Sequence, residues 1–371
     1  MQTKKQPPRH AAKDNKCPES MTGMIAPRVW WRAFRYHFVP SSFLPAILGG
    51  ILAWTQTGTM NKWFFFLVVL GVTINHIALN MTDDYFDYLA AVDQKDKKRI
   101  NPYAGGSRML TSGKIRPADM RRVFSSFYLL TIVIGLYLCV AQTWWVLAFG
   151  LFGIASSYYY TAPPIRYGYR GWGEISQLIN FSFTIGLGAY VVQAVSLSWE
   201  ALLVLSPLGL MMFAMIIINE IPDRKDDAAA GKNNLVVLLG AQKAAWLYAA
   251  ALFTAYAVIF FLPLLKMTSF WLYLALLPLP WALQAWTILK KNIRKPAALA
   301  PANLLTIRVH NLTGIFLIFA FLIQGIKNNQ SYQPAMFAVI ILTVFYLPAA
   351  VEVFFKSDDK KCGRAIFNVV K

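Results

Sequence analysis

Ten long apolar stretches alternate with short polar segments along most of the chain. They cover residues 36–54, 63–82, 122–141, 144–160, 175–195, 201–219, 244–265, 269–289, 304–326 and 335–355. Several are close to the roughly 20 residues that an α-helix needs to cross the hydrocarbon core of a bilayer. The pattern therefore predicts an all-α protein, a polytopic bundle of transmembrane helices.

The composition agrees with a membrane protein. Of the 371 residues, 57% are hydrophobic and only 14% are charged, which is unlike a soluble globular protein. A net charge of +19 would suggest nucleic acid as the partner of a soluble protein. Here the Lys and Arg residues lie beside apolar stretches, where membrane topology and anionic lipid headgroups account for them. We expect contact with membrane lipid, and we predict neither a nucleic-acid nor a protein partner.

The basic residues also predict the orientation of the helices. With ten spans and a cytoplasmic N-terminus, the inner loops contain most of the Lys and Arg residues, and the outer loops contain Lys62, Lys266 and Lys327. This is the asymmetry that the positive-inside rule describes. Residues 1–28 are interpreted as a disordered basic arm on the cytoplasmic side. The ends of the second and sixth spans are expected on the same side.

The acidic residues are concentrated in two short segments that follow the second and sixth spans. Nine of the 17 Asp and Glu residues lie there: Asp83, Asp84, Asp87, Asp93, Asp96, Glu220, Asp223, Asp226 and Asp227. Asn219, Asp223 and Asp227 are spaced i, i+4 and i+8, so they share one face if the helix continues past Pro222. A solvated face would scatter its charges, whereas ionisable groups kept at the ends of membrane spans are candidates for function.

Carboxylates on two helices are suited to Mg²⁺, which usually combines one or two carboxylates with water and substrate phosphates. Aspartates repel a diphosphate, so a metal ion must lie between them, and Lys or Arg must bind the remaining phosphate charge. The candidate metal ligands are Asp83, Asp84, Asp87, Asp223 and Asp227, and the candidate phosphate-binding residues are Arg99, Arg108 and Lys232. Together with the apolar helices, these residues indicate a lipid diphosphate as substrate.

Several of the candidates also have a purely structural interpretation. Glu174 could act as a base or orient an acceptor, but a carboxylate at the start of a helix also interacts favourably with the helix dipole. Tyr160 could stabilise a carbocation through its ring, but tyrosines also gather at the membrane interface. Arg99 lies in the basic run 95–99, which by itself indicates a headgroup anchor. Arg108 and Lys232 are therefore favoured as phosphate ligands.

The second acidic segment resembles the motif of a known family. Its Asn219, Asp223 and Asp227 match the N-x-x-x-D-x-x-x-D pattern of the UbiA superfamily of intramembrane prenyltransferases. Three further segments resemble the branch of that superfamily that prenylates 1,4-dihydroxy-2-naphthoate in menaquinone synthesis: residues 105–108, residues 160–168 with Gly173 and Glu174, and residues 231–237.

The first acidic segment departs from this motif. Asn80, Asp84 and Asp87 form a related N-x-x-x-D-x-x-D pattern. Tyr88 stands where a final Asp would be, and Asp83 is an extra acid beside the pattern. The resemblance is therefore complete for one motif and partial for the other.

The resemblance implies a fold, a domain division and an activity. The fold is nine UbiA-like spans in residues 29–330, after the basic arm 1–28 and before an additional helix and basic tail in 331–371. The activity is Mg²⁺-dependent transfer of a polyprenyl group from its diphosphate to an aromatic acceptor, at the cytoplasmic face of a bacterial inner membrane. The implied catalytic residues are Asp84, Asp87, Asp223, Asp227 and Glu174. The implied substrate-binding residues are Asn80, Asn219, Arg108, Lys232, Arg99 and Tyr160.

Three alternatives remain open at this stage. The acceptor could be a hydroxybenzoate, a chlorophyllide-like ring or a glycerol phosphate instead of a dihydroxynaphthoate. A cation-coupled transporter also keeps acids in membrane helices, although near the midplane and not at span ends. A non-catalytic lipid-binding relative would share the motifs without the reaction.

Overall fold

The computed structural model describes residues 25–92, 101, 103–329 and 331–355. In this part of the chain all regular structure is helical. The first half contains α1 (Pro27–Phe34), η1 (Tyr36–Phe38), α2 (Pro40–Thr57), α3 (Lys62–Leu89), α4 (Pro117–Ala141) and α5 (Trp145–Tyr159). The middle contains η2 (Tyr167–Arg170), α6 (Gly173–Ile179), η3 (Asn180–Leu187), α7 (Gly188–Ala194), α8 (Trp199–Ala229) and α9 (Leu235–Leu239). The last part contains α10 (Ala241–Leu264), η4 (Phe270–Leu276), α11 (Leu279–Asn292), η5 (Pro296–Leu299), α12 (Ala300–Asn329), α13 (Gln333–Ala350) and η6 (Val351–Phe355).

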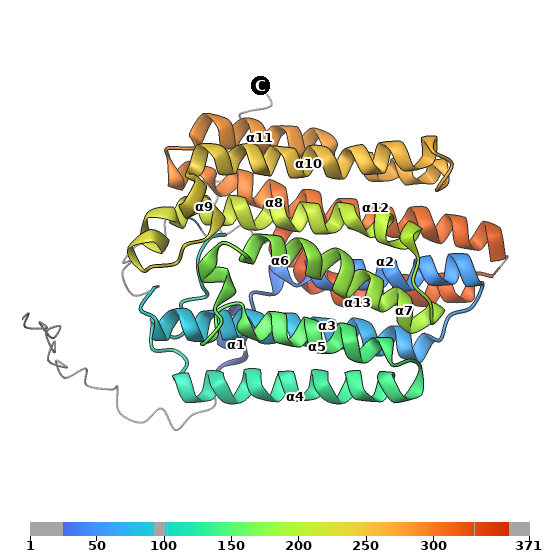
Figure 1. The fold of residues 1–371 in the computed structure, drawn as a ribbon, viewed down its shortest axis with the longest axis horizontal. Coiled ribbons are helices and arrows are strands. Elements are labelled where there is room, and N and C mark those ends of the chain that lie inside the picture. Colours follow the sequence, from blue (N-terminus) through green and yellow to red (C-terminus); the bar gives the residue numbers. More distant parts are fainter. Residues whose placement is uncertain (1–24, 93–100, 102, 330, 356–371) are drawn as a thin grey trace, which may run out of the picture.

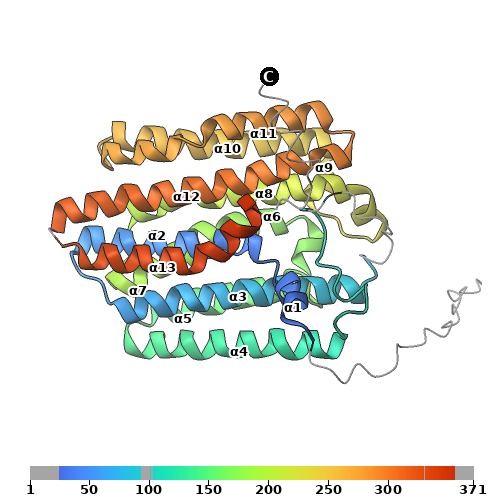
Figure 2. The same ribbon diagram turned by 180° about the vertical axis from the view of Figure 1, so that it is seen from behind.

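The long helices lie side by side in one bundle (Figures 1 and 2). Among the described residues, eight helical stretches are long and apolar enough to cross a membrane, and a ninth is counted if the pair 27–38 and 40–57, bent by 55°, is one span. The shorter apolar helix α5 corresponds to the one predicted span that is left, residues 144–160. The prediction of an all-α transmembrane bundle is therefore confirmed, and the protein is an integral membrane protein.

The centre of the bundle is formed around α2, whose side chains are almost all buried. Close packing there depends on small residues, as is usual between membrane helices. A Cβ atom added to Gly49 of α2 would lie only 2.1 Å from the backbone oxygen of Gly186 in η3. Any larger residue at position 49 would push these two helices apart.

The two helices that carry the acidic segments are longer than their apolar stretches. Helix α3 continues through Asp83, Asp84 and Asp87 of the first segment to Leu89, and α8 continues through Pro222 and the second segment to Ala229. The loops after α3, α5 and α8 gather at one end of the bundle, on the left in Figure 1 and on the right in Figure 2. We call this end the site end, because both acidic segments are found there.

Candidate active site

A cavity at the site end brings the two acidic segments together. Its volume is about 130 Å³, whereas a single water needs roughly 10–15 Å³ in the same measure. The residues that line it come from α3, α8 and the loops between helices: Arg35, Asp83, Asp87, Val92, Asn101, Ala104, Gly105, Gly106, Arg108, Tyr160, Ile216, Asn219, Glu220, Asp223, Asp226, Asp227 and Lys232. The expectation that the two segments share one site agrees with this geometry.

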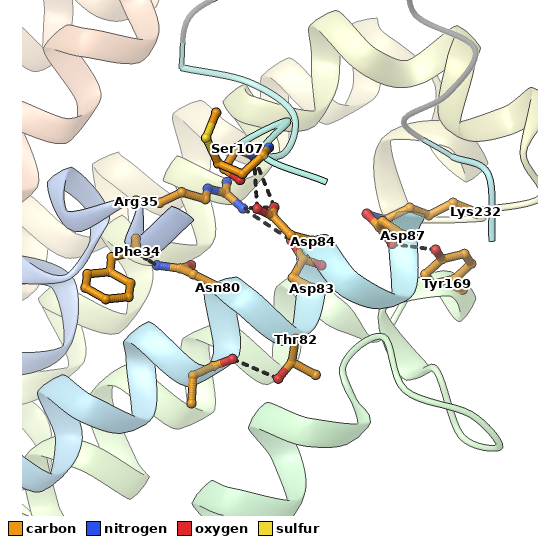
Figure 3. A network of polar contacts seen from close by, with 12 residues as sticks. Phe34, Arg35, Asn80, Thr82, Asp83, Asp84, Asp87, Ser107, Tyr169 and Lys232 are labelled. Carbon is orange, nitrogen blue, oxygen red and sulfur yellow. Dashed lines mark hydrogen bonds and ion pairs between the residues drawn. The ribbon is translucent and has the colours of Figure 1, made fainter. Parts of the chain in front are cut away.

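On α3, the cavity is faced by Asp83 and Asp87, one helical turn apart. Their neighbour Asp84 is directed at a loop instead. Both of its carboxylate oxygens accept a hydrogen bond from the backbone N–H of Ser107, at 3.1 and 3.2 Å (Figure 3). Asp84 therefore anchors the glycine-containing loop that forms one wall of the cavity. The motif predicts Asp84 as the residue that faces the cavity, but in the structure Asp83 does so.

Arg35 is a cavity residue that the sequence patterns did not identify. Its guanidinium Nη1 lies 3.3 Å from Asp83 Oδ2 and 3.8 Å from Asp84 Oδ1 (Figure 3). It stands between α1 and η1 in a left-handed backbone conformation, with φ of 49°. Arg28, Arg32 and Arg35 all precede the first apolar stretch and look like an ordinary topology signal, so no pattern in the sequence singles out Arg35.

Asp87 is held by two residues from other loops. Its Oδ1 accepts a 2.5 Å hydrogen bond from the Tyr169 hydroxyl, and its Oδ2 lies 3.1 Å from Lys232 Nζ (Figure 3). The Lys232 ammonium also stands 5.3 Å from the centre of the Tyr169 ring. Burial lowers the pKa of Lys232, but the nearby carboxylates, that of Asp87 first, outweigh burial and raise this pKa well above its ordinary value. Lys232 is thus a fixed positive charge between the two acidic segments.

Tyr169 was also missed by the sequence patterns. It lies in η2, directly after the loop 160–168 that carries part of the family resemblance. Only the fold brings its hydroxyl to Asp87, because the two residues are 82 positions apart. Its proximity to that loop was the one signal that could have drawn attention to it.

On α8, Asn219, Asp223 and Asp227 all line the cavity, as their spacing predicts. Asp227 Oδ2 accepts a 2.8 Å hydrogen bond from the side chain of Asn234. Asn234 in turn caps the first turn of α9 by accepting from the backbone N–H of Val237. The second acidic segment is therefore connected to the turn that presents Lys232.

Pro222 interrupts the hydrogen bonding of α8 between Asn219 and Asp223. Because proline has no N–H, the carbonyl of Ile218 loses its helical partner. The side chain of Asn303, from α12, donates to this carbonyl at 3.0 Å and to the side-chain oxygen of Asn219 at 2.7 Å. A neighbouring helix thus satisfies the freed group, as membrane helices with internal prolines require.

Two predicted site residues have structural partners. Asn80 donates a 3.0 Å hydrogen bond to the backbone oxygen of Phe34, at the end of α1 (Figure 3). Glu174 is fully buried, and its Oε1 accepts a 2.6 Å hydrogen bond from the backbone N–H of Leu235, the first residue of α9. Asn80 therefore helps to hold the segment that carries Arg35, and Glu174 holds α9 near the site.

The remaining predicted residues divide into two groups. Arg108 and Tyr160 both line the cavity, and Arg108 has a positive φ of 63° in the loop that Asp84 anchors. Arg99, together with Asp93 and Asp96, lies outside the described residues.

The cavity's donors fit a hard divalent cation. Among the residues that the structure describes, no three His, Cys, Asp or Glu side chains form a ready-made metal site. However, carboxylates from two helices and the amide of Asn219 face one polar cavity, and the buried Oδ1 of Asp83 has no hydrogen-bond partner in that part of the chain. This is the oxygen-rich environment in which Mg²⁺ is bound by few protein ligands and completed by substrate.

Solved structures of two UbiA homologs are similar to this fold. A UbiA homolog from Aeropyrum pernix matches 79% of this chain and 99% of its own, with a TM-score of 0.56 at 15% identity. A UbiA homolog from Archaeoglobus fulgidus, solved with GPP and Mg²⁺, matches 78% of this chain and 99% of its own, with a TM-score of 0.53 at 14% identity. At these identities the likeness concerns the fold alone.

Sequence relatives are found among bacterial enzymes. The 1,4-dihydroxy-2-naphthoate octaprenyltransferase of Bacillus subtilis is 26% identical over 258 residues, which is 70% of this chain and 81% of the relative. The enzyme of the same name from Escherichia coli is 28% identical over 304 residues, which is 80% of this chain and 96% of the relative. Residues 42–312, most of the chain, match the UbiA prenyltransferase family. This protein therefore belongs to the UbiA prenyltransferase family and is a membrane-embedded prenyltransferase.

Proposed function

We propose that the protein transfers a polyprenyl group from prenyl diphosphate to 1,4-dihydroxy-2-naphthoate, or a closely similar acceptor, in menaquinone synthesis. The observation that carries this proposal is that both acidic segments and Lys232 line one cavity at the end of a membrane bundle. Carboxylates there can hold Mg²⁺, and the cationic side chains can hold phosphate oxygens. The names of the Bacillus and Escherichia relatives support the choice of acceptor.

Mg²⁺ would supply charge neutralisation and Lewis acidity to the diphosphate. The residues that would hold the metal and its diphosphate are Asp83, Asp87, Asp223 and Asp227, with the amide of Asn219. Lys232, Arg108 and Arg35 would bind phosphate oxygens, so that negative charge accumulates on the leaving diphosphate as the bond to the prenyl carbon breaks. In this assignment, Asp84 and Glu174 support the site through the backbone groups of Ser107 and Leu235.

A prenyl cation formed in this cavity needs protection from water. Tyr160 lines the cavity, and Phe86 lies next to Asp87 on α3. The ring of Phe86 packs edge-to-face against Tyr85 at 5.2 Å and against Tyr158 at 5.9 Å. Aromatic faces stabilise a nearby cation, so Tyr160, whose side chain lines the cavity, is the candidate for this role.

The prenyl tail needs an apolar space, and a groove between α3, α4, α5 and the segment η3–α7 offers one. Two of the residues that line it, Gly135 in α4 and Gly150 in α5, are glycines inside helices. Glycine costs about 1 kcal/mol relative to alanine in a helix interior. A Cβ atom at either position would meet nothing within 4 Å, so helix packing does not explain these glycines. We assign the groove to the prenyl tail.

We further propose that the site faces the cytoplasm of a bacterial inner membrane. The support is the distribution of basic residues, which the positive-inside rule relates to the cytoplasmic side. Attaching a cysteine-reactive, membrane-impermeant label to single cysteines introduced at Lys225 and Lys266 tests this orientation. Only Lys266→Cys should react in cells whose outer face alone is exposed.

The direct test of function uses the purified protein in lipid nanodiscs. Labelled prenyl diphosphates of several lengths are combined with dihydroxynaphthoate, hydroxybenzoate and glycerol phosphate, and the lipid products are identified by mass spectrometry. We expect a prenylated naphthoquinol precursor that forms with Mg²⁺ and is lost with a chelator. Product with a different acceptor alone would overturn the proposed acceptor, and metal-independent transfer would overturn the metal assignment.

A further inference from the structure

The C-terminal helix lies beyond the part of the chain that matches the family. The match ends at residue 312, whereas α13 and η6 cover 333–355. Helix α13 packs against α2 and against η1, the short turn that follows Arg35. Figure 2 shows it in red beside α2. The additional helix therefore contacts the segment that carries a cavity residue.

Three contacts connect this helix to residues on either side of Arg35. The indole N–H of Trp31 donates to Glu352, and His37 Nδ1 lies 3.5 Å from the other Glu352 oxygen. The Tyr36 hydroxyl donates to the backbone oxygen of Phe345 at 3.0 Å. The rings of Trp31 and Tyr36 also stack, with centroids 4.7 Å apart. The segment 31–37 is thus held from its outer side by the end of the C-terminal helix.

The end of the C-terminal helix is itself fixed to the scaffold of the site. Arg308 of α12 donates to the backbone oxygen of Val353 through Nη2 at 3.0 Å and through Nε at 3.4 Å. The Val353 side chain is buried in an apolar cluster with Phe38 and Ile307. Helix α12 also carries Asn303, which binds Asn219 in the cavity wall. Helix α12 therefore contacts both the residue next to Glu352 and the second acidic segment.

Contacts on two sides support the segment that carries Arg35. The residue occupies a left-handed turn between two short helices, and neither α1 nor η1 is long enough to be stable by itself. On the inner side, Asn80 holds the carbonyl of Phe34. On the outer side, Glu352 holds Trp31 and His37. These contacts lie on both sides of the turn from which the Arg35 guanidinium reaches Asp83.

We propose that Glu352 is a positioning residue, which holds the segment 31–37 so that Arg35 faces the diphosphate-binding cavity. This inference rests on the proposed function, because it gives Arg35 a role in binding the diphosphate. In this proposal, the role of α13 and η6 is to hold residues 31–37 against one side of the site.

The test measures binding of geranylgeranyl diphosphate with Mg²⁺ by calorimetry, together with the KM for each substrate, in the full-length protein. Residues that orient a metal ligand typically contribute about 10- to 100-fold, and we expect the lower end of this range for a residue that acts through Arg35. Glu352→Ala should weaken diphosphate binding and raise the KM for the donor by roughly tenfold, with the acceptor KM unchanged. Glu352→Gln, which still accepts from Trp31, should recover part of the loss. Thr343→Ala is the matched control on α13, because its exposed hydroxyl bonds only its own helix at Val339.

A second comparison separates positioning from a general effect on stability. In an Arg35→Ala background, Glu352→Ala should have almost no further effect on donor binding. Equal effects in both backgrounds, or wild-type binding by Glu352→Ala, would overturn the proposal. If Glu352→Ala does not fold, Trp31→Phe removes the hydrogen bond to Glu352 and keeps an aromatic side chain, and the same outcomes apply. Failure of the wild-type protein to bind the donor at all would refute the proposed function instead.

Discussion

The ammonium group of Lys232 lies 3.1 Å from the carboxylate of Asp87, although 145 positions separate the two residues in the chain. Both side chains are largely buried, with 12% and 9% of their surfaces exposed. Removing one member of a buried pair leaves the other charge without compensation. This contact joins the loop after the second acidic segment to the helix that carries the first.

Replacing Lys232 with methionine should weaken binding of the prenyl diphosphate. The variant loses a cation that would contact phosphate and leaves Asp87 without its ion pair. Charged hydrogen bonds contribute about 1.5–3 kcal/mol, so we expect kcat/KM for the donor to fall by roughly 10- to 100-fold. Lys225→Met is the control, since Lys225 is exposed on α8. Equal kinetics for the two variants would exclude a phosphate-binding role for Lys232.

The pKa of Lys232 also predicts a pH dependence. Because the folded protein raises this pKa, its charge and the stabilisation it provides are fully present below the ordinary value of about 10.4. They are lost only as the pH rises above that value. Between pH 7 and 9, we therefore expect Lys232→Arg and the wild type to give parallel profiles of donor binding. A decline in the wild type alone would show that Lys232 loses its proton in this range.

Removing a carboxylate from each acidic segment tests the metal assignment. Asp87→Asn and Asp223→Asn should each reduce transfer below detection, because both face the cavity in which Mg²⁺ would meet the diphosphate. Asp119→Asn on α4, whose carboxylate pairs with Arg116 and Arg122 near the surface, should retain activity. Mn²⁺ binding followed by electron paramagnetic resonance checks the metal directly. Unchanged Mn²⁺ affinity in both site variants would remove the basis for the assignment.

The neighbouring residues Asp83 and Asp84 should give different defects. Asp83 faces the cavity, so Asp83→Asn should impair donor binding while the 104–108 loop keeps its protection from amide hydrogen exchange. Asp84 accepts from the Ser107 N–H, so Asp84→Asn should lower that protection as well as activity. If the two variants exchanged these phenotypes, α3 would be rotated relative to the geometry described above.

Filling the apolar groove should change which donor lengths are accepted. Gly135→Leu and Gly150→Leu place side chains in the space that we assign to the prenyl tail. Transfer from a long polyprenyl diphosphate should fall, whereas transfer from geranyl diphosphate should persist, because the chemistry at the cavity is untouched. Val133→Leu adds bulk on the exposed face of α4 and serves as control. An unchanged ratio of long to short products would place the tail elsewhere.

Much of the fold could be predicted because apolar stretches of membrane length leave few alternatives. Each predicted span coincides with a helical stretch; α5 has only 15 residues, and the span 175–195 is divided among α6, η3 and α7. The i, i+4, i+8 spacing of Asn219, Asp223 and Asp227 predicts one shared face if the helix continues past Pro222, and α8 does continue through this residue. The meeting of the two acidic segments followed from the orientation of the spans, since both were expected on the same side of the membrane.

The finer arrangement of the site could not be predicted in the same way. Adjacent residues on a helix point about 100° apart, so whether Asp83 or Asp84 faces the cavity depends on the rotation of α3 about its axis. That rotation is determined by packing against other helices, which sequence spacing does not reveal. Arg35 and Tyr169 reach the cavity from loops, where no periodic pattern marks the direction of a side chain.

The proline in α8 has a consequence for how this enzyme could be altered. An Ala in place of Pro222 would give the Ile218 carbonyl an intrahelical partner again and release the Asn303 amide from it. A change that strengthens one helix by itself would thereby loosen its link to α12 and the hold on Asn219. Attempts to make this chain more heat-resistant by replacing helix-breaking residues should therefore keep Pro222. A more stable α8 would come with a less ordered Asn219 in the cavity wall.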